Sequence, residues 1–359
     1  MEEVLLLILR KRLRWLYMRD PRTTIQDIAR ELQVTPSTVS RALNNHGSIS
    51  EATKKAVNKA AQKLHYRHNK IASSLRLGRT KIIGVIIPSA EINFFGSVIH
   101  GIEKVAREKG YSIIIFQSNE QTGSECDGVE TFLRSRVDGV LVSIAKQTTV
   151  FDHFQEIKRR RVPLVLFDRA NDDLGVPSVV VDDYAGAYKA TLHLAEQGCR
   201  RIAHIAGQQH VPIFKQRLAG YLAALKEAGL AIDKELIVEG DVSIESGKHG
   251  MNLLLQLPQP PDGVFAVEDF TALGALQELK DNGISVPDGI AIIGFANEAF
   301  GAFITPSLSS VDQQTIRMGE EAAHLFFKNI EGAEFYKVEP QKKVLEPVLV
   351  YRQSSMRNK

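Results

Sequence analysis

Cysteine is nearly absent from the 359-residue chain, which contains only Cys126 and Cys199. Two cysteines so far apart do not make a disulfide framework, so we interpret them as buried thiols and expect the protein in a reducing cytoplasm. The apolar run at residues 4–9 is far shorter than the about 20 residues that cross a bilayer, and its positive charges follow it. We therefore expect neither a membrane segment nor a secretory signal, and Met18 is a candidate for the native start.

The usual signatures of enzymes are absent as well. No G-x-G-x-x-G follows a predicted strand, and neither G-x-x-x-x-G-K-[ST] nor G-x-S-x-G occurs. The ten histidines show no metal-binding spacing, and His204 lies inside an apolar run, where a core histidine is expected. We expect a protein that is not an enzyme and that holds no metal and no cofactor.

Charge is unevenly distributed along the chain. Residues 1–80 carry 16 Lys and Arg against 6 Asp and Glu, whereas the remainder carries 29 against 36. A basic head on an acidic body indicates a polyanionic partner for the head alone. The length suggests two or three units of roughly 100–200 residues each.

Helical periodicity predicts three short helices in residues 24–65, with N-caps at Thr24, Thr35 and Ser50. Only Gln33 and Val34 separate the first two helices, which predicts a helix-turn-helix whose second helix reads the major groove of DNA. The predicted inward-facing residues are Ile25, Ile28, Ala29, Leu32, Val39, Ala42, Leu43, Ala52, Ala56, Val57, Ala60 and Leu64. The candidate DNA contacts are small polar side chains and one arginine that suits guanine: Thr24, Thr35, Pro36, Ser37, Thr38, Ser40, Arg41 and Asn44. Lys54, Lys55, Lys59 and Lys63 are candidates for phosphate contacts.

From Lys81 the pattern changes to short apolar runs that alternate with amphipathic segments. The runs are residues 82–87, 112–116, 139–143, 163–167, 178–181, 201–207, 263–267 and 290–295. Strands that alternate with helices predict doubly wound parallel sheets, and eight such units exceed one sheet, so we expect two lobes. We place one lobe at about 81–181 and 311–333 and the other at about 182–310 and 334–352.

Ligands of such folds bind outside the carboxyl ends of the strands, between the lobes. Polar and aromatic residues that follow the apolar runs are therefore candidates for a polyol pocket. These effector-site candidates are Phe94, Phe95, Asp168, Arg169, Arg217, Glu268 and Asn297.

Residues 23–66, TTIQDIARELQVTPSTVSRALNNHGSISEATKKAVNKAAQKLHY, closely resemble the head of the lactose/galactose repressor (LacI/GalR) family of bacterial transcription regulators. The resemblance continues over about 24–352. It implies that Pro36, Ser37 and Arg41 occupy base-contacting positions. Pro36 departs from the polar residues often found there, because it can offer only an apolar contact, for example to a thymine methyl.

The resemblance also implies functions for the linker and the pocket. Asn69, Ala72 and Leu75 match a hinge helix that enters the minor groove, with Leu75 as the wedge between base pairs. Phe94, Phe95 and Arg217 match pocket positions. The family commonly has an aspartate where this chain has Ala296, so Asn297 or Glu298 could replace it, or the ligand differs. Arg169 beside Arg217 leaves an acidic sugar or a sugar phosphate open.

We therefore expect an N-terminal extension (1–22), a helix-turn-helix domain (23–66), a hinge (67–80) and a two-lobed effector-binding and dimerisation domain (81–352). The predicted function is a homodimeric regulator, a repressor, that binds a palindromic operator under the control of a sugar or sugar derivative. A solute-binding protein of a transport system is the first alternative, although it leaves the basic head unexplained. An enzyme acting on a sugar, with the head as a targeting module, is the second.

Overall fold

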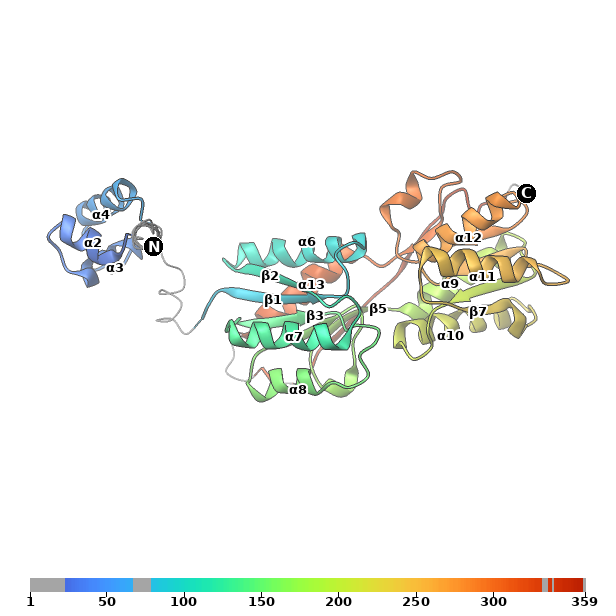
Figure 1. The fold of residues 1–359 in the computed structure, drawn as a ribbon, viewed down its shortest axis with the longest axis horizontal. Helices are drawn as coiled ribbons and strands as arrows, with labels where there is room; N and C mark the ends of the chain where they lie inside the picture. Colours follow the sequence, from blue (N-terminus) through green and yellow to red (C-terminus); the bar gives the residue numbers. More distant parts are fainter. Residues whose placement is uncertain (1–22, 67–78, 331–334, 338, 358–359) are drawn as a thin grey trace, which may run out of the picture. The chain divides into compact units, whose positions relative to one another are not determined.

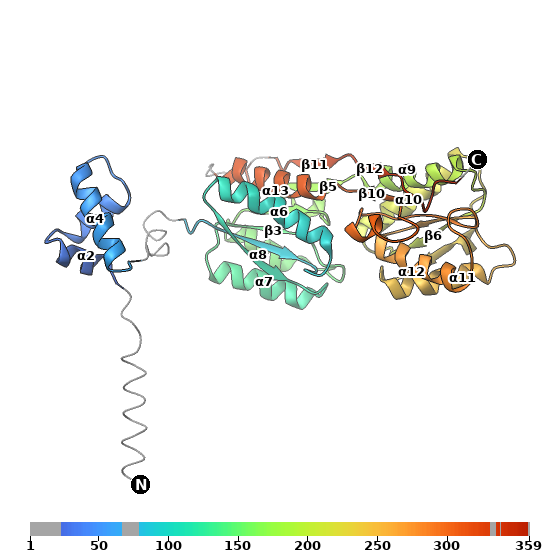
Figure 2. The same cartoon turned by 90° about the horizontal axis from the view of Figure 1, so that it is seen from above.

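The computed structural model describes residues 23–66, 79–330, 335–337 and 339–357. The chain divides into two compact units at Gly78 (Figures 1 and 2). Asn69, Ala72 and Leu75 of the predicted hinge lie outside the described residues. No helix within the described residues is long and apolar enough to cross a membrane.

Within residues 23–66, the described part of the first unit, three helices form a bundle: α2 (Ile25–Glu31), α3 (Pro36–Leu43) and α4 (Glu51–Lys63). Its core forms where the apolar faces meet, and Ile28, Val39 and Val57 are fully buried. The predicted helices are confirmed, but the inner face of α4 is partly wrong. Ala52 and Ala56 are exposed, and Ala61 is buried instead, since the helix presents the 57–60–61–64 face to its neighbours.

The second unit contains two parallel α/β lobes, which confirms the predicted fold class. The first lobe has a six-stranded sheet in the order β11-β5-β4-β3-β1-β2, in which every pairing is parallel. Its strands are β1 (Ile82–Ile87), β2 (Ser112–Gln117), β3 (Gly139–Val142), β4 (Leu164–Phe167), β5 (Ser178–Val181) and β11 (Lys342–Leu345). Its helices are α6 (Asn93–Glu108), α7 (Thr122–Arg134), α8 (Asp152–Arg159), α13 (Thr315–Ile330) and the short η1 (Asp172–Leu174).

The side chains of β1 alternate between the two faces of this sheet. Ile83, Val85 and Ile87 pack with α6 and α13, whereas Ile86 packs with α7 and α8. Figure 2 shows these helix pairs on opposite sides of the strands. A strand buried on both faces reads as a continuous apolar run, which is why residues 82–87 carry so strong a signal.

The second lobe has a four-stranded parallel sheet in the order β7-β6-β8-β9. Its strands are β6 (Ile202–Ala206), β7 (Ile237–Glu239), β8 (Gly263–Ala266) and β9 (Ala291–Ile293). Its helices are α9 (Asp183–Glu196), α10 (Pro212–Glu227), α11 (Ile244–Leu255), α12 (Asp269–Asp281) and the short η2 (Lys234–Leu236) and η3 (Ala299–Ala302). α9 and α10 cover one face, and α11 and α12 cover the other (Figure 2). His204 is a fully buried core residue of β6, stacked on Phe265, and burial lowers its pKa to about 4.

The chain crosses between the lobes three times, after β5, after β10 (Ser310–Asp312) and between β11 and β12 (Val348–Val350). β10 and β12 form a two-stranded antiparallel ladder. The expected assignment of residues 334–352 to the second lobe is wrong for β11, because this strand pairs with β5 at the edge of the first sheet. The third crossing therefore lies at Glu346 and Pro347, not near residue 334.

Candidate functional site

The second helix of the head, α3, presents the predicted DNA-contacting residues at the surface. Thr35, Pro36, Ser37, Arg41 and Asn44 are exposed, while Thr38 and Ser40 are half-buried. The buried Val39 and Ala42 anchor the opposite face of the helix in the core. An exposed polar helix on an apolar support is the geometry that major-groove reading needs.

Two of these residues also shape the ends of α3. The Thr35 hydroxyl accepts a hydrogen bond from the Thr38 backbone N–H at 3.2 Å, which caps the helix. The Asn44 amide donates to the Ser40 carbonyl at 2.8 Å. Within the described residues nothing pairs with the Arg41 guanidinium, so α3 offers one long cation beside short hydroxyls.

Thr24 lies at the start of α2, not on α3. Its backbone N–H and its hydroxyl both donate to the Asp27 carboxylate, at 2.9 and 2.7 Å. These bonds lower the pKa of Asp27. Among the predicted phosphate contacts, Lys54 and Lys63 form ion pairs at 2.8 Å with Glu51 and Glu31, whereas Lys55 and Lys59 are exposed.

The second unit has a cavity of about 80 Å³ between its lobes, which we call the aromatic slot. It lies where strands of both lobes end, as the strand-end rule expects. The residues that line it are Ile92, Phe94, Phe95, Glu120, Lys146, Asp168, Arg169, Ile213, Phe214, Arg217, Val242, Glu268, Phe270, Ala296 and Gln313. The structure thus brings together six of the seven predicted effector-site residues, all except Asn297.

Arg217 is the most constrained charge of the slot. The side chain is buried, and its Nε donates to Asp183 at 2.8 Å while a terminal nitrogen donates to the Val267 carbonyl at 2.7 Å. The guanidinium also lies 3.6 Å from the centroid of the Phe295 ring. Burial raises the pKa of Asp183 to about 6 against the opposing effect of Arg217, so this carboxyl is largely ionised at pH 7.

Asp168 and Arg169 follow β4 at the wall of the slot. Asp168 is buried, has a φ of 58°, and accepts a hydrogen bond from the Ser143 hydroxyl at 2.9 Å. Burial raises the pKa of Asp168, although Arg169 opposes this. Arg169 donates to both carboxylate oxygens of Glu120, at 3.0 and 2.7 Å. Burial alone would lower the pKa of Arg169, but the Glu120 and Asp168 carboxylates outweigh it and raise it.

The second lobe contributes the Glu268 carboxyl to the lining of the slot, and the Asp269 and Glu298 carboxyls lie near enough to affect it. Glu268 caps α12 by accepting from the Phe270 N–H at 2.8 Å. Burial and the Asp269 carboxylate raise the pKa of Glu268 to about 8, so this side chain is largely neutral at pH 7. Asp269 accepts from the Ser310 hydroxyl at 2.6 Å and from the Glu298 N–H at 2.7 Å. Glu298 accepts from the Phe94 N–H at 3.1 Å and so joins the two lobes.

The first lobe contributes the aromatic pair. Phe94 and Phe95 lie in the first turn of α6 with their rings edge to face, 5.0 Å between centroids. Both rings are buried. An aromatic wall beside carboxylates and guanidinium groups suits a ligand with a flat apolar face and polar edges.

Asn297 is the exception among the predicted residues. Its amide donates to Asp312 at 3.1 Å and its oxygen accepts from Arg352 at 2.8 Å, so it ties the crossover strands together instead of lining the slot. Of the alternatives for the family's aspartate, neither Asn297 nor Glu298 lines the slot, which leaves the alternative that the ligand differs. Ala296 itself lines the slot and has a φ of 128°, a conformation that is rare for a residue with a side chain.

Three polar slot residues escaped the sequence analysis, namely Glu120, Lys146 and Gln313, as did the apolar Ile92, Ile213, Phe214, Val242 and Phe270. Gln313 is buried, and its Oε1 has no hydrogen-bond partner within the described residues. Glu120 follows β2, so the rule used for the other candidates would have found it. Gln313 follows β10, a short strand that no apolar run announces, so the same rule could not have found it. Lys146 Nζ lies 3.8 Å from Glu120, and burial lowers the pKa of Lys146.

A wider chamber of about 810 Å³, which we call the vestibule, adjoins the aromatic slot. The two cavities share Lys146, Asp168, Arg169 and Ile213. The loops after β3 and β4, the start of α9 and the start of α10 form its walls. Across the cleft, the Lys146 carbonyl is 3.1 Å from the His210 Nε2.

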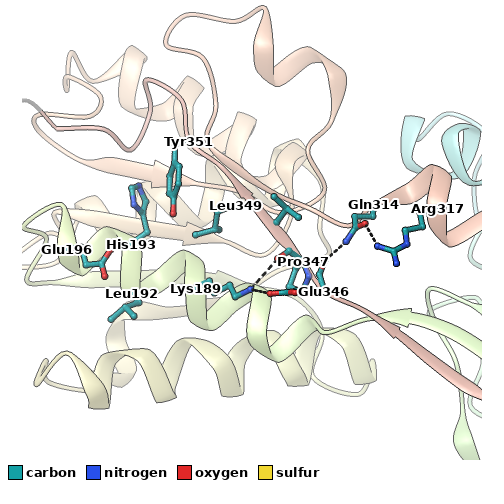
Figure 3. Close-up of a pocket in the computed structure, with 11 residues that line it drawn as sticks. Lys189, Leu192, His193, Glu196, Gln314, Arg317, Glu346, Pro347, Leu349 and Tyr351 are labelled. Atoms are coloured by element: carbon teal, nitrogen blue, oxygen red, sulfur yellow. Dashed lines mark hydrogen bonds and ion pairs between the residues drawn. The ribbon is translucent and has the colours of Figure 1, made fainter.

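Another groove of about 540 Å³ lies apart from the cleft, along α9, β12 and the start of α13 (Figure 3). Lys189 is bound there to Glu346 at 2.8 Å, and Arg317 to Gln314 at 3.0 Å. None of the predicted effector-site residues lines this groove, so the cleft is the better candidate site.

Both units match known families. The family described as bacterial regulatory proteins, lacI family, matches residues 24–69, and the periplasmic binding protein-like domain matches residues 191–355. The chain is 35% identical over 309 residues to the HTH-type transcriptional repressor CytR of Escherichia coli (strain K12), which covers 86% of this chain and 90% of that repressor.

Solved structures agree with this assignment. The transcriptional regulator CelR in complex with cellobiose shares 31% identity with a TM-score of 0.69, over 93% of this chain and all of that chain. The lac repressor dimer bound to operator and the anti-inducer ONPF shares the fold, with 22% identity and a TM-score of 0.83 over 93% of this chain and 99% of that one. These relatives are transcription regulators and not enzymes. The chain therefore belongs to the lacI family of bacterial regulatory proteins and is a DNA-binding transcriptional repressor.

Proposed function

We propose that the protein acts as a homodimer that binds a palindromic operator through α3, and that a sugar or sugar derivative in the interlobe cleft controls its affinity for this operator. An effector that binds one arrangement of the lobes better than another shifts the equilibrium between them, and the coupling to DNA is reciprocal. The lobes are joined by three crossings, so a ligand held by both lobes can bias their arrangement.

The observation that carries the effector proposal is the polar wall of the aromatic slot. The buried Gln313 Oε1 and Arg169 Nε lack hydrogen-bond partners among the described residues. Buried polar groups are normally paired, and an unpaired one in a concave site is explained by a ligand that supplies the partner. The similar regulator CelR was solved with cellobiose, which supports a sugar.

DNA reading is assigned to α3 with Thr35, Pro36, Ser37, Thr38, Ser40 and Arg41 as the groove-facing set. Short side chains let the helix approach the base edges, and Arg41 is the residue suited to bidentate bonding to guanine. We further propose that Leu75 of the hinge wedges into the minor groove at the operator centre. Leu75→Ala should then weaken specific binding far more than non-specific binding, whereas equal losses would count against the wedge.

Dimerisation is assigned to the free edge of the first sheet. β2 is an edge strand, and its adjacent residues Ile114 and Ile115 are 43% and 46% exposed although they point to opposite faces. Exposed apolar edge strands pair with other chains. Ile114→Lys should shift sedimentation toward the monomer, and Val150→Lys, at an apolar loop residue that is more exposed than Ile114, is the control. A dimer that survives Ile114→Lys would redirect the search to another surface.

The test of the whole function is selection of duplex DNA from a random library with the purified full chain. The selected sequence is then bound at two salt concentrations, with and without a panel of sugars. We expect a palindromic sequence whose affinity one of the compounds changes, and the direction of the change shows whether that compound releases the repressor. Binding that is only salt-labile and without sequence preference would contradict operator reading.

A further inference from the structure

We propose that the effector consists of two units: a flat ring that occupies the aromatic slot, and an uncharged, hydroxyl-bearing unit that occupies the vestibule. This inference rests on the proposed function, because both cavities belong to the interlobe cleft. It narrows the effector to a class that the sequence left open.

The volumes of the two cavities indicate that the effector extends beyond the slot. The aromatic slot holds about 80 Å³, far below the roughly 300–1,000 Å³ of small-molecule sites. The vestibule holds about 810 Å³ and shares the lining residues Lys146, Asp168, Arg169 and Ile213 with the slot. A ligand anchored in the slot therefore extends past these four residues into the vestibule.

The shape of the slot selects the first unit. Phe94 and Phe95 from the first lobe and Phe214 and Phe270 from the second all line the slot, together with Ile92 and Ile213. Four aromatic side chains around a narrow space favour a flat ring, either a sugar with an apolar face or a heteroaromatic ring. The unpartnered Gln313 Oε1 lies in the same slot and can accept from the edge of such a ring.

The charge of the vestibule selects the second unit. Five aspartates line it (Asp168, Asp172, Asp173, Asp182 and Asp183) against three cations (Lys146, Arg169 and Lys342). Arg169 is bound by Glu120, Lys342 lies 2.7 Å from Asp172, and Asp183 is bound by Arg217. These pairs leave Asp168, Asp173 and Asp182 against the single cation Lys146.

An anionic group such as a phosphate would thus face an excess of carboxylates without a free fork to bind it. Hydroxyl groups, in contrast, can donate to these carboxylates. The geometry points away from the sugar phosphate that the arginine pair in the sequence suggested.

The experiment is calorimetric titration of the full chain with three matched groups of compounds. Cellobiose and adenosine are neutral two-unit compounds from two sources, a disaccharide and a nucleoside. Glucose and adenine are the one-unit parts that would occupy the slot, and glucose 6-phosphate and ribose 5-phosphate are the anionic forms of the parent sugars glucose and ribose. We expect at least one two-unit compound to bind about tenfold or more tightly than its one-unit part, as the loss of hydrogen bonds to charged groups implies. We expect neither phosphate to bind more tightly than its parent sugar.

A pair of variants locates the second unit. Gln216 lines the vestibule but not the slot, so Gln216→Trp should reduce the affinity for the two-unit compound about tenfold and bring it to that of the one-unit part. The neighbouring Lys215 is exposed and lines neither cavity, so Lys215→Trp is the matched control and should leave both affinities unchanged.

Tighter binding of a one-unit part or of a phosphate, or no binding of either two-unit compound, would overturn the inference. An unchanged two-unit affinity in Gln216→Trp would also overturn it. Operator binding measured on the same preparations tests the proposed function separately, since a chain that binds operator can still fail this test.

Discussion

Glu268 provides a test that needs no knowledge of the effector. Its carboxyl lies in the aromatic slot next to Asp269 and accepts one hydrogen bond, from the Phe270 N–H. Glu268→Gln keeps the size of the side chain and an oxygen that can accept this bond. The substitution removes only the ability to become charged in a site where burial and a neighbouring carboxylate disfavour the charge.

The direction and the size of the pH effect on stability follow from the shifted pKa of Glu268. The pKa of Glu268 rises from 4.5 to about 8 on folding, so its favourable contribution to stability is present below pH 4.5 and is lost as the pH rises through 8. At about 1.4 kcal/mol for each pH unit, the loss across this window reaches roughly 5 kcal/mol. The side chain is only half-buried in the cleft, and solvent screening reduces the expected loss to roughly 2–3 kcal/mol.

The assay is urea denaturation of the wild type and of Glu268→Gln at pH 5, 7 and 9, followed by circular dichroism. The variant should be more stable than the wild type at pH 9, and the gain should shrink toward pH 5. Glu91→Gln, at an exposed position, is the control and should show no such trend. A gain that is the same at pH 5 and pH 9, or no gain at pH 9, would refute the assignment of a buried, neutral Glu268.

Three further outcomes are expected. Arg41→Ala should weaken specific operator binding by roughly 1–3 kcal/mol and relax the base preference at one position, as measured by fluorescence anisotropy on single-base operator variants. An unchanged base preference would show that Arg41 is not one of the residues that read the operator. Arg217→Ala should destabilise the protein by about 3–5 kcal/mol, because Asp183 is left buried without its partner. Adding Asp183→Asn should recover part of this loss in a double-mutant cycle. Additive losses would show that the two side chains do not interact. Gly274→Ala should lower the free energy of unfolding by about 1–3 kcal/mol in denaturant titrations, because a Cβ there would lie 1.9 Å from the Ile244 carbonyl oxygen where α11 packs on α12. An unchanged free energy of unfolding would mean that these helices can move apart.

The sequence predicted the strands that contain continuous apolar runs, and each of the eight runs contains a strand of the structure. Seven of these strands are largely buried, because burial from both sides demands uninterrupted Val, Ile and Leu, whereas β2 is an exposed edge strand with the same composition. The strands it missed are β7, β10, β11 and β12, which have three or four residues each and carry polar or exposed side chains. Such segments are strands because a neighbour supplies the hydrogen bonds, and their own composition does not indicate it.

The residues of the candidate site were also only partly predictable from the sequence. The rule that ligands bind at the carboxyl ends of strands identified Phe94, Phe95, Asp168, Arg169, Arg217 and Glu268 as neighbours before any coordinates. It wrongly included Asn297, because two residues that follow one strand can point to different partners. Here Asp312 and Arg352, both distant in sequence, hold the Asn297 amide away from the slot.

The sequence by itself determined the family, the helix-turn-helix and the two-lobed α/β class, since these follow from local periodicity, capping residues and the order of apolar runs. Only the tertiary structure decided that β11 belongs to the first sheet, that Gln313 lines the slot, and that Glu120 and Asp183 neutralise the two arginines. These facts depend on contacts between residues 30 to 160 positions apart. Such contacts fix the charge and the volume of the cleft, and with them the kind of effector that the repressor can bind.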